Sequence, residues 1–493
     1  MRSRILPKAA PLTTIAAATV IALGLAACSS SSSPKTSSSA TTSSSAGTGA
    51  SAAAGSSAAG SAPAAGGSSA AGAVSNISGT VNWWGWTPTD TATANNYISA
   101  FNKQYPNIKV NYKLVNISDW VAALRPALAS GQGPDVFDVQ PGAYVTEFNS
   151  FAEDLTPLAE KALGSDWKSM VAPIGISGLM SGNKLTSMSV GSTFAGMLWI
   201  NENIFKKYNL TAPTNLTDWE HVCQVLKQNK VGCFVQGAAQ EGFDQDTLQS
   251  IANSVQPGLW TKASTGDAKW NDPGIVKTLS IWKELFTGGI MQSGAVGYQQ
   301  YPDANNDFLT GKYAMVMMGT WYTQYATVKA MTAALSAAGV SGAKPFPIQP
   351  IAFPDVAGAG NSSEMYGDSD FGLAVSTKTK NKAAAEAFVA WVTTTTAGQQ
   401  VVADQLDDLP ALKSVQPNFN AIQLVDPASQ TAPVQALVTK VGSVNEPREA
   451  LLGSDVQTAI LAAATSVATG SASPQAAADT LQKAAVAAGE TFK

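Results

Sequence analysis

The sequence predicts an α/β fold. Strand-like and helix-like segments alternate along a body of over 400 residues, and no repeat with a fixed period of about 20–50 residues is present. Thr80–Trp84 has the composition of a strand, Asn95–Tyr105 places its apolar residues at helical spacing, and Ile108–Tyr112 alternates as the next strand. A body of this length suggests two or more domains or lobes.

The alternation continues beyond these first elements. Gly131–Pro134 turns the chain into a strand at Asp135–Val139, and Met197–Ile200 is a further strand. Asp218 is predicted to cap a helix, because its carboxylate can accept hydrogen bonds from the free N–H groups of a first turn. The α/β pattern therefore extends well past the first three elements.

The N-terminus has the pattern of an export signal. Arg2, Arg4 and Lys8 form a positive region, and an apolar run too short to span a membrane follows. The tetrad Leu25-Ala-Ala-Cys28 resembles the lipobox of bacterial lipoproteins, which implies cleavage before Cys28 and thioether lipidation of its sulfur. The alternative is an ordinary secretory signal in which the cysteine occurs by chance.

Residues 1–27 are thus predicted to be a signal peptide and residues 28–76 a tether. Ser, Ala, Gly and Thr dominate the tether, and Lys35 is its only charge. Such a segment cannot bury enough apolar area to offset its chain entropy, so we expect it to be disordered, with a reach on the order of 35–40 Å. With a lipid on Cys28, it would hold the body at the extracytoplasmic face of the cell membrane. The alternative is a dispensable low-complexity insert.

Charge and cysteine content limit the partners and the compartment. The chain has 30 Lys and Arg against 34 Asp and Glu, and loss of the three basic residues of the signal leaves a balance of −7. There is no basic excess to attract nucleic acid. Cys223 and Cys233, ten residues apart, are predicted to form a disulfide outside the cytoplasm. The alternative is two buried thiols.

Six segments of the body carry short motifs that are weak singly and specific in combination. They are Phe101–Val110; Ser130–Val136; Leu198–Tyr208 with Pro213 and Thr217–Glu220; Phe308–Met315 with Met318–Trp321; Gly372–Ser376 with Lys380–Phe388; and Leu409–Lys413. In this order they resemble the family 1 extracellular solute-binding proteins, the group that includes maltose-binding protein. The resemblance covers nearly the whole body.

The resemblance implies a two-lobed, periplasmic-binding-protein-like fold of class II, in which crossover segments form a hinge between two α/β lobes. Ser187–Ser192 and Tyr366–Asp370 have the polar composition that suits such crossovers. The first lobe would comprise residues 77–189 and 366–410, and the second residues 193–362 and 411–493, which end in C-terminal helices.

The resemblance also implies a monomeric substrate-binding protein of an ABC importer, which closes on a solute and docks on a membrane permease. The supply of 12 Trp favours a carbohydrate, because an aromatic ring stacks on the apolar face of a sugar while planar polar groups bind its hydroxyls. Acids such as Asp138, Asp244 and Asp370 keep a polyamine or another small solute open as an alternative. A second alternative is an exported enzyme that acts on polysaccharide through a carboxylate pair.

Candidate ligand residues follow strands, because open α/β sheets bind ligands at strand ends. Trp84 and Trp86 share one side of the first strand if extended geometry continues through Gly85, and Asp138 and Gln140 end a later strand. Packing is the alternative for the tryptophans. By resemblance, the remaining candidates are Phe243, Asp244, Trp321, Tyr366, Asp368 and Asp370, while Arg448 is either a contact or a surface charge.

Motifs for catalysis are absent from the sequence. The single histidine, His221, makes a His-based triad or a His-rich metal site improbable. There is no Gly-x-Ser-x-Gly elbow and no phosphate-binding loop of the Gly-x4-Gly-Lys type. We therefore expect no catalytic residue, no cofactor and no metal.

Overall fold

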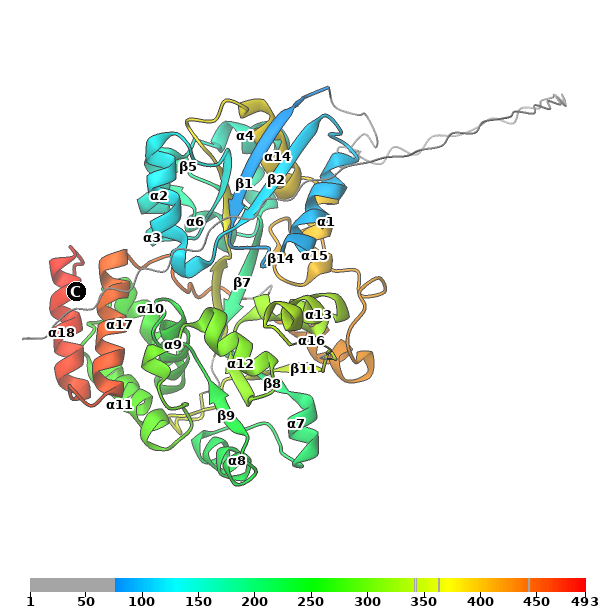
Figure 1. The fold of residues 1–493 in the computed structure, drawn as a ribbon. Helices are drawn as coiled ribbons and strands as arrows, with labels where there is room; N and C mark the ends of the chain where they lie inside the picture. The colour runs from blue at the N-terminus through cyan, green and yellow to red at the C-terminus, as the bar shows by residue number, and fades with distance from the viewer. Residues whose placement is uncertain (1–75, 341, 343, 362–363, 442–443) are drawn as a thin grey trace, which may run out of the picture. The chain divides into compact units, whose positions relative to one another are not determined.

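The computed structural model describes residues 76–340, 342, 344–361, 364–441 and 444–493 (Figure 1). The predicted signal peptide, Cys28 and the tether up to residue 75 lie outside the described residues. Helices and strands alternate as the sequence predicts. In the part of the chain that is described, no helix has both the length and the apolar character needed to cross a membrane.

A five-stranded sheet forms the centre of the first lobe. Its order is β2-β1-β3-β13-β6, with β1 parallel to β2 and β3, and β13 antiparallel to β3 and β6. The buried core around it runs from Val81 to Val190 and resumes from Phe371 to Val415. The core therefore continues five residues beyond Pro410, the predicted end of this lobe. The strands are β1 (Gly79–Gly85), β2 (Ile108–Leu114), β3 (Val136–Val139), β6 (Met188–Ser189) and β13 (Gly372–Val375), with a small hairpin of β4 (Met180–Ser181) and β5 (Lys184–Leu185) beside them.

Local sequence signals explain where the helices of this lobe begin and end. Asp90 caps the first of them by accepting the N–H of Thr93 at 2.8 Å, and the same helix buries Tyr97 and Phe101 against the sheet. Gly131, at φ +73°, ends the second helix, Trp120–Ser130, in the left-handed conformation that glycine tolerates. The helices are α1 (Thr91–Asn102), α2 (Trp120–Ser130), α3 (Ala143–Phe148), α4 (Thr156–Leu163), α5 (Trp167–Met170), α6 (Ile174–Ser177), α14 (Lys382–Thr394) and α15 (Thr396–Gln405).

A four-stranded sheet of order β11-β8-β10-β9 forms the centre of the second lobe. Strand β8 is antiparallel to β10 and β11, and β9 is parallel to β10. The buried core of this lobe begins at Phe194 and ends at Ala485. The strands are β8 (Met197–Asn201), β9 (Gly232–Val235), β10 (Tyr313–Met317) and β11 (Ile348–Ala352).

The helices of the second lobe include the two that end the chain, α17 and α18, which pack side by side (Figure 1). One predicted cap was wrong: Asn215 caps α8 by accepting the N–H of Asp218 at 2.9 Å, and Asp218 lies in the first turn. Both residue types can cap, so the sequence did not distinguish them. The helices are α7 (Glu202–Lys207), α8 (Leu216–Gln228), α9 (Phe243–Val255), α10 (Leu259–Ser264), α11 (Pro273–Thr287), α12 (Asn305–Leu309), α13 (Val328–Ala337), α16 (Pro427–Val441), α17 (Ser454–Ala468) and α18 (Pro474–Ala487).

A small third sheet connects the lobes. Its central strand, β7 (Gly191–Ala195), is antiparallel to both β12 (Tyr366–Ser369) and β14 (Leu409–Pro410). Figure 1 shows β7 passing from the region of β1 and β2 toward the region of β8 and β9. The chain passes between the two cores at residues 191–193, 367–370, 404–405, 407–410 and 416–423. The segments 191–193, 367–370 and 407–410 lie in or directly beside the strands of the third sheet, and we call them the first, second and third crossovers.

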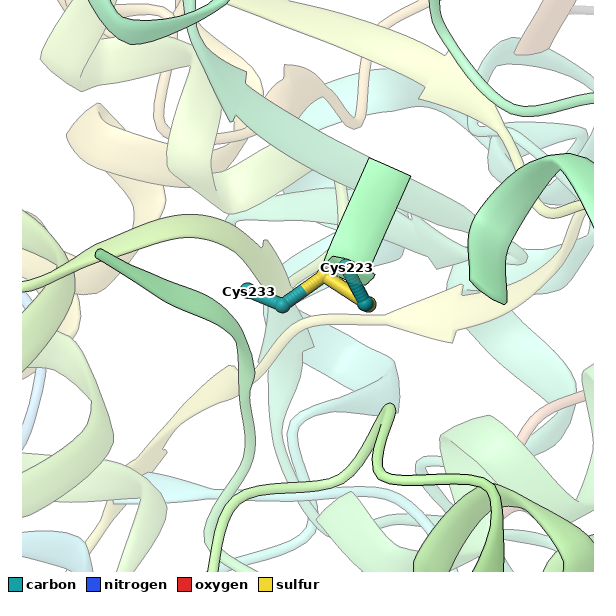
Figure 2. Close-up of a disulfide and its surroundings, with 2 residues drawn as sticks. All are labelled: Cys223 and Cys233. Carbon is teal, nitrogen blue, oxygen red and sulfur yellow. A yellow bond between two sulfur atoms is a disulfide. The ribbon is translucent and has the colours of Figure 1, made fainter. Parts of the chain in front are cut away.

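A disulfide joins Cys223 of α8 to Cys233 of β9 (Figure 2). Their Cα atoms are 4.9 Å apart, and both side chains are buried in the core of the second lobe. The bridge closes a short loop and holds the helix to the strand that follows it.

Replacing both cysteines by alanine should lower the free energy of unfolding by about 2–3 kcal/mol, because the unfolded chain regains the entropy that the closed loop removes. Urea denaturation of the purified protein measures the change. The parent protein under reducing conditions should show a similar loss, and a double variant as stable as the oxidised parent would contradict the expectation.

Candidate ligand-binding cleft

A cleft of about 220 Å³ is lined by both lobes and by the crossovers. The first lobe contributes residues that follow β1, β2 and β3, and the second lobe contributes α13 and the loops around α9, α12 and β10. Of the ten predicted ligand residues, five line this cleft: Trp86, Gln140, Phe243, Trp321 and Asp370.

Trp86 is positioned by a buried carboxylate behind it. Asp138 accepts the backbone N–H of Trp86 at 3.0 Å and that of Thr87 at 3.4 Å, and it accepts the indole N–H of Trp83 at 2.9 Å. A Cβ on Gly85 would lie 2.4 Å from Asp138 Oδ2, so a glycine is needed for this approach. The carboxylate turns the chain at the end of β1 and directs Trp86 into the cleft.

Asp138 itself was predicted to contact the ligand, and the structure places it outside the cleft lining. Its side chain is fully buried, both oxygens are used by Trp83, Trp86 and Thr87, and it is not part of the cleft lining. Burial raises its pKa well above the usual range of an aspartic acid, although those hydrogen bonds oppose the shift. Asp138 is a structural residue.

Trp84 also lies away from the cleft lining. Its half-buried ring is covered by the ammonium of Lys113 on the neighbouring strand β2, with Nζ 3.5 Å from the ring centroid. Strand β1 ends at Gly85, where the backbone turns toward Asp138. The extended geometry that would place Trp84 and Trp86 on one side therefore stops between them.

Trp321 forms the wall of the second lobe. A Cβ at Gly319 would lie 2.1 Å from Trp321 Cζ3, so the Gly-x-Trp spacing allows the ring to fold over its own backbone. The Thr320 hydroxyl between them accepts the backbone N–H of Phe194 at 2.9 Å and attaches this turn to β7. Phe243 meets Trp321 edge to face, with centroids 6.1 Å apart. The ring is 8% exposed and packs against Phe243 and the backbone of Gly319.

Arg448 packs behind these aromatic rings. Its Cζ lies 4.9 Å from the centroid of Trp321 and 5.7 Å from that of Phe243, a cation–π arrangement. Nε and Nη2 donate to Asp246 at 2.6 and 2.9 Å, and Nη1 pairs with Glu449 at 2.8 Å. These contacts hold the pKa of Arg448 above its ordinary value, against its burial, so its charge is permanent and already paired.

Asp368 and Tyr366, both predicted ligand residues, hold the hinge instead. Asp368 Oδ2 accepts the backbone N–H groups of Arg448, Glu449 and Ala450 at 3.2, 2.6 and 2.9 Å. The buried Tyr366 hydroxyl bonds to Ser250 Oγ at 2.9 Å and to the carbonyl of Asp246. Neither side chain is part of the cleft lining, because residues alternate along β12 and these two face the Arg448 segment and α9.

Three acids line the inner part of the cleft. Asp370 accepts the Thr193 hydroxyl at 2.9 Å, and Asp407 accepts the amide of Gln324. Asp90, the cap of α1, is the third. Burial raises the pKa of Asp370 and Asp407, and the charge of Asp370 raises that of Asp407 further.

Asp244 is the last of the predicted ligand residues that lie outside the cleft lining. Its side chain is fully buried, its oxygens have no hydrogen-bond partner within the described residues, and burial raises its pKa well above the usual range. Consecutive residues of a helix point about 100° apart, so α9 can direct Phe243 or Asp244 into the cleft but not both.

Several lining residues were not predicted. Asp90 carries an N-cap signal, which indicates a helix start and says nothing of a ligand, and Asp407 is one of two adjacent acids just before the Leu409–Lys413 motif. The position of two adjacent acids directly before a recognised motif was the signal that could have pointed to Asp407. Others include Tyr301, Asn305, Asn306, Gln324 and Tyr325, together with four alanines of α13.

The fold and the cleft define a two-lobed binding protein whose hinge lies beside its ligand site. Residues 85–399 match the family model of bacterial extracellular solute-binding proteins. Because the match covers more than half of the chain, the protein belongs to this family, whose members act outside the cytoplasm. Within the described residues, no group of three or more His, Cys, Asp or Glu is placed to hold a metal ion.

Relatives and solved structures agree with this assignment. The chain is 24% identical over 235 residues to an uncharacterized ABC transporter extracellular-binding protein of Pyrococcus horikoshii, a match that covers 46% of this chain and about half (52%) of that relative. It is 26% identical over 343 residues to the multiple sugar-binding protein of Streptococcus mutans, across 67% of this chain and 74% of that one.

Among solved structures, the GacH receptor of Streptomyces glaucescens matches with a TM-score of 0.65 and 20% identity, over 85% of this chain and 100% of that chain. A chitin oligosaccharide binding protein matches with a TM-score of 0.63 and 18% identity, over 82% and 98%. At these identities the likeness establishes the two-lobed fold.

Replacing Arg448 by methionine should lower the free energy of unfolding by about 3–5 kcal/mol, because Asp246 and Glu449 would remain buried without their cation. The double variant Arg448→Met/Asp246→Asn should regain part of that loss. Denaturant unfolding of the two variants measures the coupling. Equal stability of the parent and the single variant would show that the ion pair contributes nothing.

Proposed function

We propose that this protein captures a carbohydrate, a mono- or oligosaccharide, in the cleft and delivers it to the permease of an ABC importer. The observation that carries the proposal is Trp321, a rigidly held aromatic ring on the wall of a cleft that also presents amide and carboxyl groups. A sugar offers an apolar face to such a ring and hydroxyls to Gln140, Asn305 and Asp370.

The relatives support the same class of solute. One is a multiple sugar-binding protein, and two structural neighbours are a receptor solved in complex with acarbose and a chitin oligosaccharide binding protein. Trp86 on the first lobe lies across the cleft from Trp321 on the second, so lobe closure would bring an aromatic ring to each side of the solute. Closure would also exclude water and strengthen the polar contacts.

Two further parts of the proposal concern location and chemistry. A lipid on Cys28 and the tether of residues 29–76 would keep the binding protein near its permease.

We also infer that the protein is not an enzyme, since its family consists of binding proteins. Incubation with oligosaccharides should therefore give stoichiometric binding and no cleavage product.

Trp321→Ala should weaken binding of the carbohydrate by about 2 kcal/mol, roughly 30-fold, because the stacking surface is lost. A thermal-shift screen of saccharides finds the ligand, which at 100 times its dissociation constant should add about 2.7 kcal/mol of stability. Calorimetry then compares the variants.

The matched control is Trp84→Ala, which removes a tryptophan that lies outside the cleft lining. It should bind as the parent does. Unchanged affinity in Trp321→Ala would remove this ring from the site, and a screen in which only a polyamine shifts the melting temperature would overturn the carbohydrate proposal.

Cys28→Ala should move the protein from the membrane fraction to the soluble extracytoplasmic fraction, because the lipid attachment atom is lost. Fractionation and mass spectrometry of the N-terminal peptide test this. The Cys223→Ala/Cys233→Ala variant serves as the control and should stay with the membrane. Retention of the Cys28 variant would contradict lipid anchoring.

A further inference from the structure

The cleft carries an excess of negative charge. Among the described residues that line it, the charged side chains are Asp90, Asp370, Asp407 and Arg448. Arg448 offsets the three acids only in part: Asp246 and Glu449, which lie outside the lining, engage its guanidinium, while its charge also lowers the pKa of Asp370. A neutral solute would leave this imbalance in place when the lobes exclude water.

Two of the acids belong to the hinge itself. Asp370 ends the second crossover and Asp407 begins the third, and the charge of one raises the pKa of the other. Asp407 is only 7% exposed. Their hydrogen-bond partners, Thr193 and Gln324, are uncharged. Neither carboxyl group has a direct ion-pair partner among the described residues, although the charge of Arg448 lowers the pKa of Asp370.

An ammonium group on the solute would supply that partner. It can donate to either carboxylate in charge-assisted hydrogen bonds, which are about twice as strong as neutral ones. The aromatic side chains Trp86, Tyr301 and Tyr325 line the same cavity, and ring faces attract cations. Acids and rings together favour a positively charged group over a neutral one.

A separate observation calls for a hydrogen-bond acceptor on the solute. The Nε1 atom of Trp321 is buried; the Tyr301 hydroxyl is near enough to accept from it, but the hydrogen bond is not well aligned. A buried N–H without an acceptor is costly, and a sugar hydroxyl can accept from it. Protonated polyamine nitrogens are donors only, so a polyamine would leave this group unsatisfied.

We propose that the solute is a saccharide with a protonated amino group, and that Asp370 and Asp407 bind this group from the two crossovers. The inference rests on the proposed function, since it narrows the class of carbohydrate. Asp90, at the start of α1, adds to the negative potential around the same position.

Calorimetry on the purified, full-length mature protein tests the proposal with matched pairs of saccharides. Each pair differs only in an amino group against a hydroxyl, as in glucosamine and glucose, galactosamine and galactose, or the β-1,4 oligosaccharides of glucosamine and of glucose. At least one amino sugar should bind about tenfold or more tightly than its neutral partner, and added salt should reduce that preference. N-acetylation of the amino sugar removes the charge and should abolish the preference.

Variants then assign the selectivity to residues. Asp407→Asn and Asp370→Asn should each bring the ratio of the two affinities, amino sugar over its neutral partner, most of the way to one. Asp244→Asn is the matched control, because it neutralises a buried acid outside the cleft lining. It should keep the selectivity of the parent.

The outcomes separate this inference from the function on which it rests. If neutral sugars bind as tightly as their amino partners, or if nothing in the panel binds, the amino-sugar proposal fails. Binding of neutral sugars alone would leave the carbohydrate function standing. Binding of spermidine with no saccharide of either kind would overturn both.

Discussion

The buried ion pair between Arg448 and Asp246 is the interaction on which the geometry of the cleft depends. Asp246 lies on α9 in the second lobe, and the segment around Arg448 is attached through Asp368 to the strand β12 of the hinge. The guanidinium in turn backs the rings of Phe243 and Trp321. Arg448 therefore connects three parts of the structure: the hinge strand, helix α9 of the second lobe, and the aromatic rings of the cleft wall. Desolvation offsets much of the attraction in a buried ion pair of this kind. Its main effect is therefore to fix the relative positions of the groups around it, with a smaller effect on the free energy of unfolding.

Buried carboxyl groups have two distinct uses in this molecule. Asp138 and Asp368 accept backbone N–H groups and shape the chain, one behind Trp86 and the other at the hinge. Asp370 and Asp407 also have hydrogen-bond partners, yet they lie at the cavity. The difference comes from what surrounds each group. Both oxygens of Asp138 are occupied, and three peptide N–H groups converge on Oδ2 of Asp368, whereas Asp370 and Asp407 are each held by a single hydroxyl or amide and retain capacity for a ligand.

Particular residues show why part of the site could be predicted. Trp321 was identified because Gly319 precedes it at a fixed spacing, and the structure explains that spacing by the close approach of the ring to the glycine backbone. Gln140 and Trp86 were identified because they follow strands. Tyr366 and Asp368 lie near the hinge on β12. Asp368 contacts the Arg448 segment, some 80 residues away in sequence, and Tyr366 contacts α9, some 120 residues away. No local pattern encodes those partners.

The sequence by itself determined the α/β class, the membership of a solute-binding family and the two-lobed arrangement, because periodicity, turn residues and short ordered motifs are local properties of the chain. Only the tertiary structure decided which acids serve the fold and which face the solute. Asp138, Asp244, Asp370 and Asp407 are the same residue type; the first lies in β3, the second in α9, and the last two follow β12 and α15. Their roles depend on burial and on partners brought from distant segments, such as Thr193 for Asp370 and Gln324 for Asp407. Long-range packing sets those surroundings, and a carboxyl group takes its function from them.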